Sequence, residues 1–133
     1  MSSLIVTPLT AGALAILFVL LSGQVIRLRR RDAVGIGHGG SQDLRRAIRA
    51  HGNFAEHVPL ALIALGLMEG SGLTPSWLLW LLGGTLVVSR VLHAIGLSRS
   101  AGTSVGRFAG SALTLLFLLV AGCALIVIGV QQG

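Results

Sequence analysis

Long uncharged apolar runs dominate the hydropathy pattern of the chain. The first run, Leu4 to Ile26, contains 23 residues and no charged side chain. Because a helix rises about 1.5 Å per residue, roughly 20 apolar residues cross a hydrocarbon core about 30 Å thick. A cleaved signal peptide carries its basic residues before the apolar region, but here they follow it: Arg27, Arg29, Arg30 and Arg31. The pattern therefore predicts a retained membrane helix.

Three further segments have the length of membrane helices. The second extends from about Asp43 to Met68, with a polar first third and an apolar remainder. The third has Thr74 as its predicted N-cap and Pro75 as its first helical residue, and it extends to about Leu97. The fourth runs from about Arg107 to Val130.

These segments predict an all-α membrane protein. Lipid offers no water to unpaired backbone groups, so spanning segments fold as helices, and the two-residue alternation of a strand does not occur here. Of all residues, 53% are hydrophobic and 11% are charged, whereas soluble domains carry about 25% charged residues. This composition excludes soluble globular and disordered proteins. We predict one domain, residues 1–133, built as a four-transmembrane-helix bundle.

The arginines indicate the orientation of this bundle. All ten basic residues are arginine, and seven of them lie in the first long loop and its flanks: Arg27, Arg29, Arg30, Arg31, Arg45, Arg46 and Arg49. The other three lie around the last loop: Arg90, Arg99 and Arg107. The turn at residues 69–76 holds one Glu and no Arg, and both termini lack Arg. The positive-inside rule therefore places the arginines in the cytoplasm and both termini on the non-cytoplasmic side. Basic charge beside apolar runs also argues against a nucleic-acid partner.

A polar strip descends along the second segment. At about 100° per residue, Arg49, Asn53 and Glu56 fall within about 60° of one another on a helix. Ionisable residues inside a membrane helix are costly and are therefore functional candidates. The structural alternative is an Arg49–Glu56 pair that neutralises itself. Arg90 and His93, spaced i, i+3, and Arg107 are either anchoring residues or parts of the same site.

The chemistry of these groups suits a small zwitterion. Arginine forms bidentate bonds with carboxylates, glutamate accepts from an ammonium group, and an arginine beside a thiol stabilises its thiolate. Glutathione carries two carboxylates, one ammonium group and one thiol. A metal is not expected, because the four histidines are scattered and the single cysteine, Cys123, lies in an uncharged segment.

Glycines add two structural predictions. Two Gly-x-x-x-Gly pairs, Gly66/Gly70 and Gly106/Gly110, allow close approach between helices. A third pattern, at residues 35–40, matches G-x-G-x-x-G, but no strand precedes it, so we interpret it as a loop and not as a dinucleotide site.

Residues 49–59, Arg-Ala-His-Gly-Asn-Phe-Ala-Glu-His-Val-Pro, resemble the R-A-x-x-N-x-x-E-x-x-P signature of the MAPEG family, the membrane-associated proteins in eicosanoid and glutathione metabolism. The likeness covers nearly the whole chain. Residues 90–93, Arg-Val-Leu-His, are similar to the R-x-x-H of the third helix in the prostaglandin E synthase branch. The Gly-rich loop is similar to that of small bacterial members, which implies a bacterial inner membrane location.

The resemblance implies a homotrimer that binds glutathione between subunits near the cytoplasmic face. It implies that Arg49, Asn53 and Glu56 hold the peptide, with help from Arg90 and His93 of the third helix. Arg107 resembles the arginine that stabilises the thiolate. Two departures from the family pattern stand out. Gly52 replaces a second arginine of several eicosanoid enzymes, and the chain has no tyrosine, with Leu97 at one family tyrosine position.

Two functions follow as hypotheses. The first is a glutathione-dependent transferase or peroxidase, in the manner of microsomal glutathione transferases, acting on lipophilic electrophiles dissolved in the membrane lipid. The second is a non-catalytic subunit that presents lipids or scaffolds a larger membrane assembly. A small multidrug exporter also has four helices, but its essential carboxylate lies in the first helix, and the first segment here has no charge.

Overall fold

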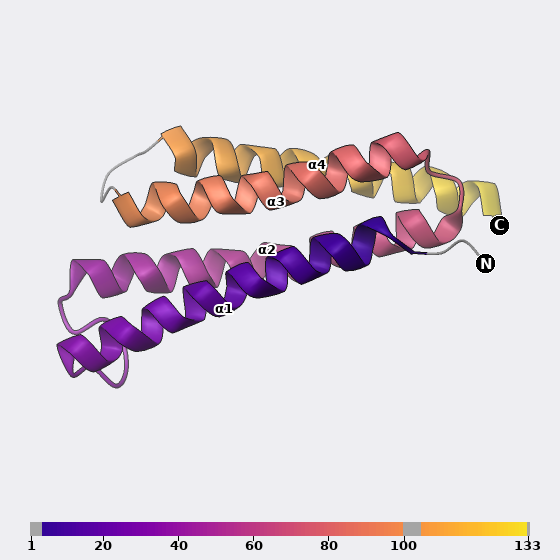
Figure 1. Ribbon diagram of the computed structural model, residues 1–133. Coiled ribbons are helices and arrows are strands. Elements are labelled where there is room, and N and C mark those ends of the chain that lie inside the picture. The colour runs from indigo at the N-terminus through magenta and orange to yellow at the C-terminus, as the bar shows by residue number, and fades with distance from the viewer. Residues whose placement is uncertain (1–3, 100–104, 133) are drawn as a thin grey trace.

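The computed structural model describes residues 4–99 and 105–132, and these contain four helices (Figure 1). The helices are α1 (Val6–Asp32), α2 (Gln42–Ser71), α3 (Ser76–Arg99) and α4 (Val105–Gln132). Three of them are long and apolar enough to cross a membrane: α1, α4 and the Ser76–Gly96 part of α3. The predicted all-α membrane bundle is confirmed. α2 has 30 residues and a length of about 45 Å, and it lies beside the apolar helices despite its polar first third.

The four helices form two pairs with a central seam. Figure 1 shows α1 beside α2 and α3 beside α4. α2 and α3 each contact all three other helices, so the seam between them is the middle of the bundle. Its core contains Phe54 and Leu65 of α2, Leu86 of α3 and Phe117 of α4, all nearly inaccessible. Large apolar side chains on α1 and α4 point outward, as a lipid-facing surface requires.

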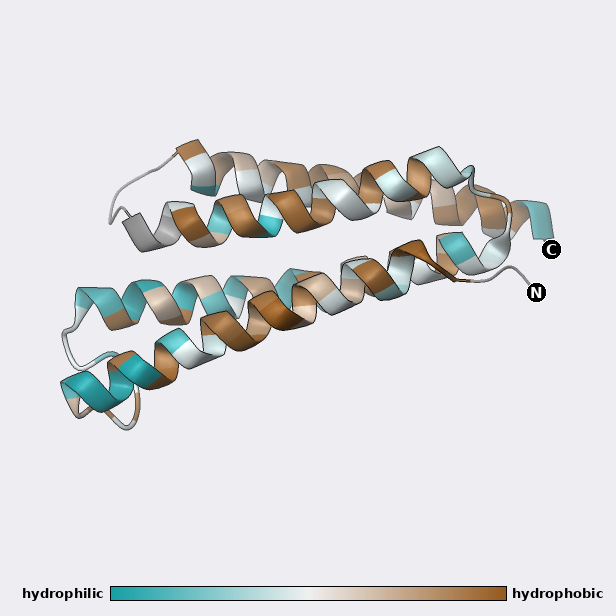
Figure 2. Cartoon of the chain, viewed as in Figure 1, coloured by the Kyte–Doolittle hydropathy of each residue, from teal (hydrophilic) through white to brown (hydrophobic). Residues whose placement is uncertain are grey.

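The arginine-rich end of the bundle is where α1 ends and α2 begins. Figure 2 shows hydrophilic residues gathered there, in contrast to the apolar length of α1 and α4. The arginines that follow the first apolar run were predicted to lie in a loop, but α1 continues through them to Asp32. Ala33 then ends the helix in the left-handed conformation. Arg29 donates hydrogen bonds to the carbonyl oxygens of Gly35 and Gly37 and so holds the Gly-rich loop against the helix end.

The opposite end of the bundle differs from the prediction in two places. Glu69 belongs to the last turn of α2 and not to a connecting turn, because the helix runs to Ser71 and ends at Gly72, whose φ is 69°. α3 begins at Ser76, one residue later than predicted, and the N–H of Leu79 donates to the carbonyl of Pro75. Pro75 thus precedes the helix instead of occupying its first position.

Glu69 accepts the hydrogen bonds of the first N–H groups of α1. The first N–H groups of a helix have no partner inside the helix, and α1 has no capping side chain of its own. The Glu69 carboxylate, 7% exposed, accepts from the N–H groups of Ile5 and Val6 at 2.8 Å each and of Thr7 at 2.7 Å. The end of α2 therefore caps the beginning of α1.

One of the two predicted glycine contacts is present. A Cβ added at Gly110 would lie 2.6 Å from the carbonyl oxygen of Ser89, and one at Gly106 would lie 3.2 Å from that of Leu92, so α4 packs tightly on α3. The other pair does not bring helices together. A Cβ at Gly70 would meet nothing within 4 Å, and one at Gly66 would make only ordinary contact with α1.

Candidate functional site

A buried arginine lies at the central seam of the bundle. Arg90 of α3 is 2% exposed, and its guanidinium group reaches both neighbouring helices. Nη1 donates to Oδ1 of Asn53 on α2 at 2.8 Å, and Nη2 donates to the carbonyl oxygen of Gly110 and to Oγ1 of Thr114 on α4, at 3.1 and 2.5 Å. Nε has no hydrogen-bond partner in the described part of the chain. Arg90 thus joins α2, α3 and α4 through one side chain.

The partners of Arg90 are all neutral. No carboxylate in residues 4–96 and 105–132 forms an ion pair with it. An isolated charge is costly to bury, and hydrogen bonds reduce that cost without removing the charge. Arg90 therefore places a net positive charge inside the arginine-rich half of the bundle.

Asn53 is oriented by Arg90. A guanidinium group only donates hydrogen bonds, so the Asn53 atom that faces it must be the carbonyl oxygen. The Asn53 NH₂ group then remains to donate to something else. Asn53 is half-buried, and a ligand that reaches it from the surface of α2 meets a hydrogen-bond donor.

Arg49 and Glu56 point away from the seam. Both side chains are exposed, and neither makes a hydrogen bond or ion pair within the described residues. The self-neutralising Arg49–Glu56 pair is therefore not formed. The polar strip divides along its length: Asn53 turns inward to α3, while the two charged residues remain at the outer surface of α2.

His93 and Arg107 lie one turn nearer the arginine-rich end. His93 is 7% exposed, and its Nδ1 lies 3.2 Å from Oγ of Ser111 on α4. The ring also lies against the backbone of Arg107, at the start of the same helix. The structure thus brings together Asn53, Arg90, His93 and Arg107 at the meeting of α2, α3 and α4. Arg49 and Glu56 lie on the same arc of α2 but are exposed, and neither makes a hydrogen bond or ion pair with this group in the described residues.

Sequence reasoning missed two hydroxyl residues of this group. Thr114 is 1% exposed and Ser89 is fully buried, and their hydroxyl oxygens lie 3.0 Å apart. Thr114 accepts from Arg90 and donates to the carbonyl of Gly110, so it fixes the guanidinium group from the α4 side. The available signal was the presence of two hydroxyl residues, Ser111 and Thr114, in the apolar fourth segment, but only the packing shows which residues they face.

Other polar residues of α2 have structural contacts. The ring of His51 stacks on Phe18 of α1, with ring centres 4.8 Å apart. Nδ1 of His57 lies 2.9 Å from the carbonyl oxygen of Asn53, one turn back on the same helix. Within the described ranges, no three His, Cys, Asp or Glu side chains are grouped as a metal site requires.

Comparison with known proteins finds a family and relatives that the chain resembles. The model of the MAPEG family matches residues 7–127. The chain is also similar to the inner membrane protein YecN of Escherichia coli strain K12, with 36% identity over 91 residues, which are 68% of this chain and 69% of that protein. YecN of Escherichia coli O6:H1 gives the same identity over the same length.

Proposed function

The chain belongs to the MAPEG family, membrane proteins of glutathione and eicosanoid metabolism, and from this premise we propose that it is a glutathione-dependent transferase or peroxidase acting on lipophilic electrophiles. It is a membrane protein with three helices in the described residues that are long and apolar enough to span the bilayer, and it is similar to YecN, an inner membrane protein. Its electrophilic substrates would reach the site from the lipid, because the outward surfaces of the bundle are apolar.

One observation carries the proposal: the charged ends of the strip are unpaired while its centre is held in place. Arg49 and Glu56 are exposed and have no partner in the described chain, so they are available to a carboxylate and an ammonium group. Asn53 lies between them with its NH₂ group free to donate. Two charges of opposite sign with a donor between them match the zwitterionic backbone of glutathione.

The reaction then depends on the thiol. The positive charges of Arg90 and Arg107 favour the thiolate over the thiol. In the transferase reaction, the thiolate sulfur forms a bond to an electrophilic carbon, and the displaced group leaves with the electron pair. In the peroxidase reaction, the thiolate sulfur bonds to the terminal oxygen of a hydroperoxide, the O–O bond breaks, and the alkoxide leaves and takes up a proton to give the alcohol. The resulting sulfenic acid of glutathione then reacts with a second glutathione to give the disulfide and water.

We further propose that the active form is a homotrimer with α2 at the subunit contacts. Arg49 and Glu56 are exposed on a single chain. Exposure of such groups to lipid costs about 2.5–3.5 kcal/mol each at mid-membrane. A subunit interface would cover both residues and enclose a ligand between two chains. A monodisperse monomer in native mass spectrometry from mild detergent would contradict this assembly.

The second candidate function is a non-catalytic subunit that presents lipid or scaffolds a membrane assembly. The observation that favours it is the small number of donors around the strip. The chain has no tyrosine, and the position of Gly52 is open, since an added Cβ would meet nothing within 4 Å. A site with fewer donors binds glutathione more weakly, and a subunit without catalysis does not need it.

Calorimetric titration of the purified chain with glutathione tests the proposal. Glu56→Gln keeps the volume and removes the charge, so glutathione affinity should fall about ten- to a hundredfold. Arg49→Met should lower the glutathione affinity by a similar factor. Arg107→Met should preserve the affinity and reduce the ultraviolet absorbance of the bound thiolate. Arg30→Gln is the matched control, because Arg30 is exposed at the same end and lies outside the strip. If the glutathione affinity is unchanged in both Glu56→Gln and Arg49→Met, the result would refute the enzyme and favour the scaffold.

A further inference from the structure

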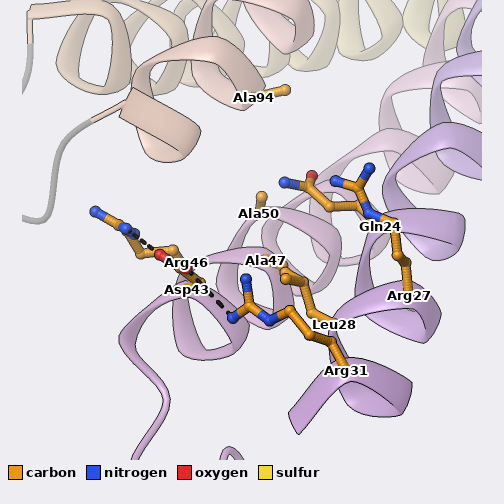
Figure 3. Close-up of a pocket in the computed structure, with 9 residues that line it drawn as sticks. All are labelled: Gln24, Arg27, Leu28, Arg31, Asp43, Arg46, Ala47, Ala50 and Ala94. Atoms are coloured by element: carbon orange, nitrogen blue, oxygen red, sulfur yellow. Dashed lines mark hydrogen bonds and ion pairs between the residues drawn. The ribbon is translucent and has the colours of Figure 1, made fainter.

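A polar cavity lies between α1 and α2 at the arginine-rich end. Its volume is about 200 Å³, and the side chain of Ala94 on α3 closes its far side (Figure 3). Nine residues line it: Gln24, Arg27, Leu28, Arg31, Asp43, Arg46, Ala47, Ala50 and Ala94. None of these belongs to the group around Arg90 or to the Arg49/Asn53/Glu56 strip. The arginine cavity is therefore lined by a different set of residues from the proposed glutathione site.

The charges of the arginine cavity are unbalanced. Three arginines line it, and one carboxylate, that of Asp43, opposes them. Oδ1 of Asp43 accepts from Arg46 at 2.5 Å and Oδ2 accepts from Arg31 at 3.3 Å. Figure 3 shows these two arginines, Arg31 of α1 and Arg46 of α2, joined through Asp43. Hydrogen bonds from Arg46 and then Arg31 lower the pKa of Asp43, so it is ionised at neutral pH.

The α1 side of the cavity also carries hydrogen-bond donors that have no acceptor in the described residues. Arg27 and Gln24 lie on successive turns of α1 and line the cavity. Neither makes a hydrogen bond within the described ranges of the chain. Asp32, which does not line the cavity, pairs with Arg31 at 2.6 Å, and Asp43 pairs with Arg46. The guanidinium group of Arg27 is therefore the positive charge of the lining that neither carboxylate neutralises. An anion bound there would receive hydrogen bonds from a guanidinium group and an amide, and it would face two more guanidinium groups.

We propose that the arginine cavity binds a phosphate group, either that of an anionic phospholipid or free phosphate. Arginine is suited to phosphate, because its forked donors match two phosphate oxygens at once. A water molecule occupies about 30 Å³ in the liquid, so a cavity of 200 Å³ holds a phosphate group and a few adjoining atoms. The proposal does not rest on glutathione binding.

The height of the cavity in the membrane favours the lipid phosphate as the source. Gln24 and Arg27 stand where the first apolar run meets the arginines. This is the level at which a helix passes from the hydrocarbon core to the phosphate groups of the leaflet. Clusters of basic residues next to a membrane helix attract anionic lipids. An acyl chain attached to a phosphate in the cavity could continue along the apolar outer face of α1.

Native mass spectrometry of the full chain, with lipid added to neutral detergent, tests this proposal. The wild-type chain should retain phosphatidylglycerol in preference to phosphatidylcholine. Arg27→Gln and Arg46→Gln should each reduce the apparent affinity for phosphatidylglycerol about tenfold. Asp43→Asn should raise it, because the substitution removes the anion that competes for Arg31 and Arg46. Arg30→Gln removes the same charge from the same helix outside the cavity, and it should leave the affinity unchanged.

Titration with inorganic phosphate identifies the source of the phosphate group. Binding of inorganic phosphate that is lost in Arg27→Gln assigns the cavity to free phosphate, and retention of phosphatidylglycerol alone assigns it to lipid. An equal loss of affinity for phosphatidylglycerol in Arg27→Gln and Arg30→Gln would overturn the proposal, because binding would then depend on the overall positive charge and not on the cavity. Displacement of phosphatidylglycerol by glutathione would also overturn it. The glutathione proposal fails separately, through indifference to Arg49→Met, and that result leaves the arginine cavity untouched.

Discussion

Two buried charges in this protein are stabilised in opposite ways. Glu69 lies at the end of α2 away from the arginines, and its carboxylate accepts three hydrogen bonds from backbone N–H groups of α1. Arg90 lies nearer the arginine-rich end, and its partners are two side chains and one carbonyl on two other helices. Backbone partners are fixed by the helix, whereas side-chain partners can also respond to a ligand. Glu69 therefore stabilises the start of α1, whereas Arg90 orients Asn53.

The largest expected effect concerns the Glu69 side of this comparison. Glu69→Ala leaves the first N–H groups of α1 without their acceptors, and the loss should lower the free energy of unfolding by about 3 kcal/mol. Thermal unfolding in detergent measures it. Arg30→Gln is the control at the other end of α1, because Arg30 is exposed, lies outside the strip and should not affect stability. An unchanged unfolding temperature for Glu69→Ala would show that the cap contributes nothing.

The next effect concerns Arg90. Arg90→Met removes the donor that holds the Asn53 carbonyl, so the NH₂ group is no longer aimed at the ligand, and glutathione affinity should fall about tenfold. Arg90→Met removes the cost of burying the guanidinium charge, but it also leaves the Asn53 and Thr114 oxygens without their donor, and these two effects partly offset each other. The fall in unfolding temperature should therefore be smaller than for Glu69→Ala. If Arg90→Met unfolds readily but binds glutathione with normal affinity, Arg90 contributes to stability and not to the orientation of Asn53.

A gain of binding tests the same site from the open side. Gly52 is one residue before Asn53, and no atom lies within 4 Å of a Cβ built there. Gly52→Arg can therefore add a guanidinium donor without displacing the bundle, and it should raise glutathione affinity about tenfold. Gly52→Met is the control of similar length without charge. Calorimetry that shows equal affinity in both variants would argue against a glutathione site at this face.

The smallest effect concerns Thr114. Thr114→Val keeps the shape and removes the hydroxyl that accepts from Arg90 and contacts Ser89. Stability should fall by about 1 kcal/mol, with a two- to threefold loss of glutathione affinity through the loosened guanidinium group. Ser22→Ala is the control, because the Ser22 hydroxyl donates only within α1. A loss as large as that of Arg90→Met would mean that Thr114 contributes as much as the arginine.

Much of the fold could be predicted from the sequence, because membrane helices have a strong and specific hydropathy pattern. Apolar runs longer than the hydrocarbon core is thick, with arginines at their ends, have few alternative structures. The predicted helix boundaries differed where charged residues lie at helix ends. Arg29 to Arg31 continue α1 because a helix can extend beyond the lipid, and Glu69 remains in α2 because its carboxylate has partners on α1.

The sequence identified the residues of the polar strip but not the neighbours that each of them contacts. Helical periodicity placed Arg49, Asn53 and Glu56 on one 60° arc of α2. The structure turns Asn53 to Arg90 and leaves the other two at the surface. A short amide at one edge of the arc fits against α3, while longer charged side chains extend outward. Periodicity relates residues of one helix to each other, and it does not tell which neighbour each of them meets.

The sequence by itself determined the membrane environment, the four helices, the arginine-rich end and the polar strip of α2. All of these depend on hydropathy and charge along the chain, which are local properties. The tertiary structure alone decided that Glu69 caps α1, that Thr114 holds Arg90, and that Gln24, Arg27 and Arg46 surround a cavity with Asp43. Each of these joins residues of different helices. Their meeting depends on the rotation and spacing of packed helices, here set partly by the close contact at Gly110.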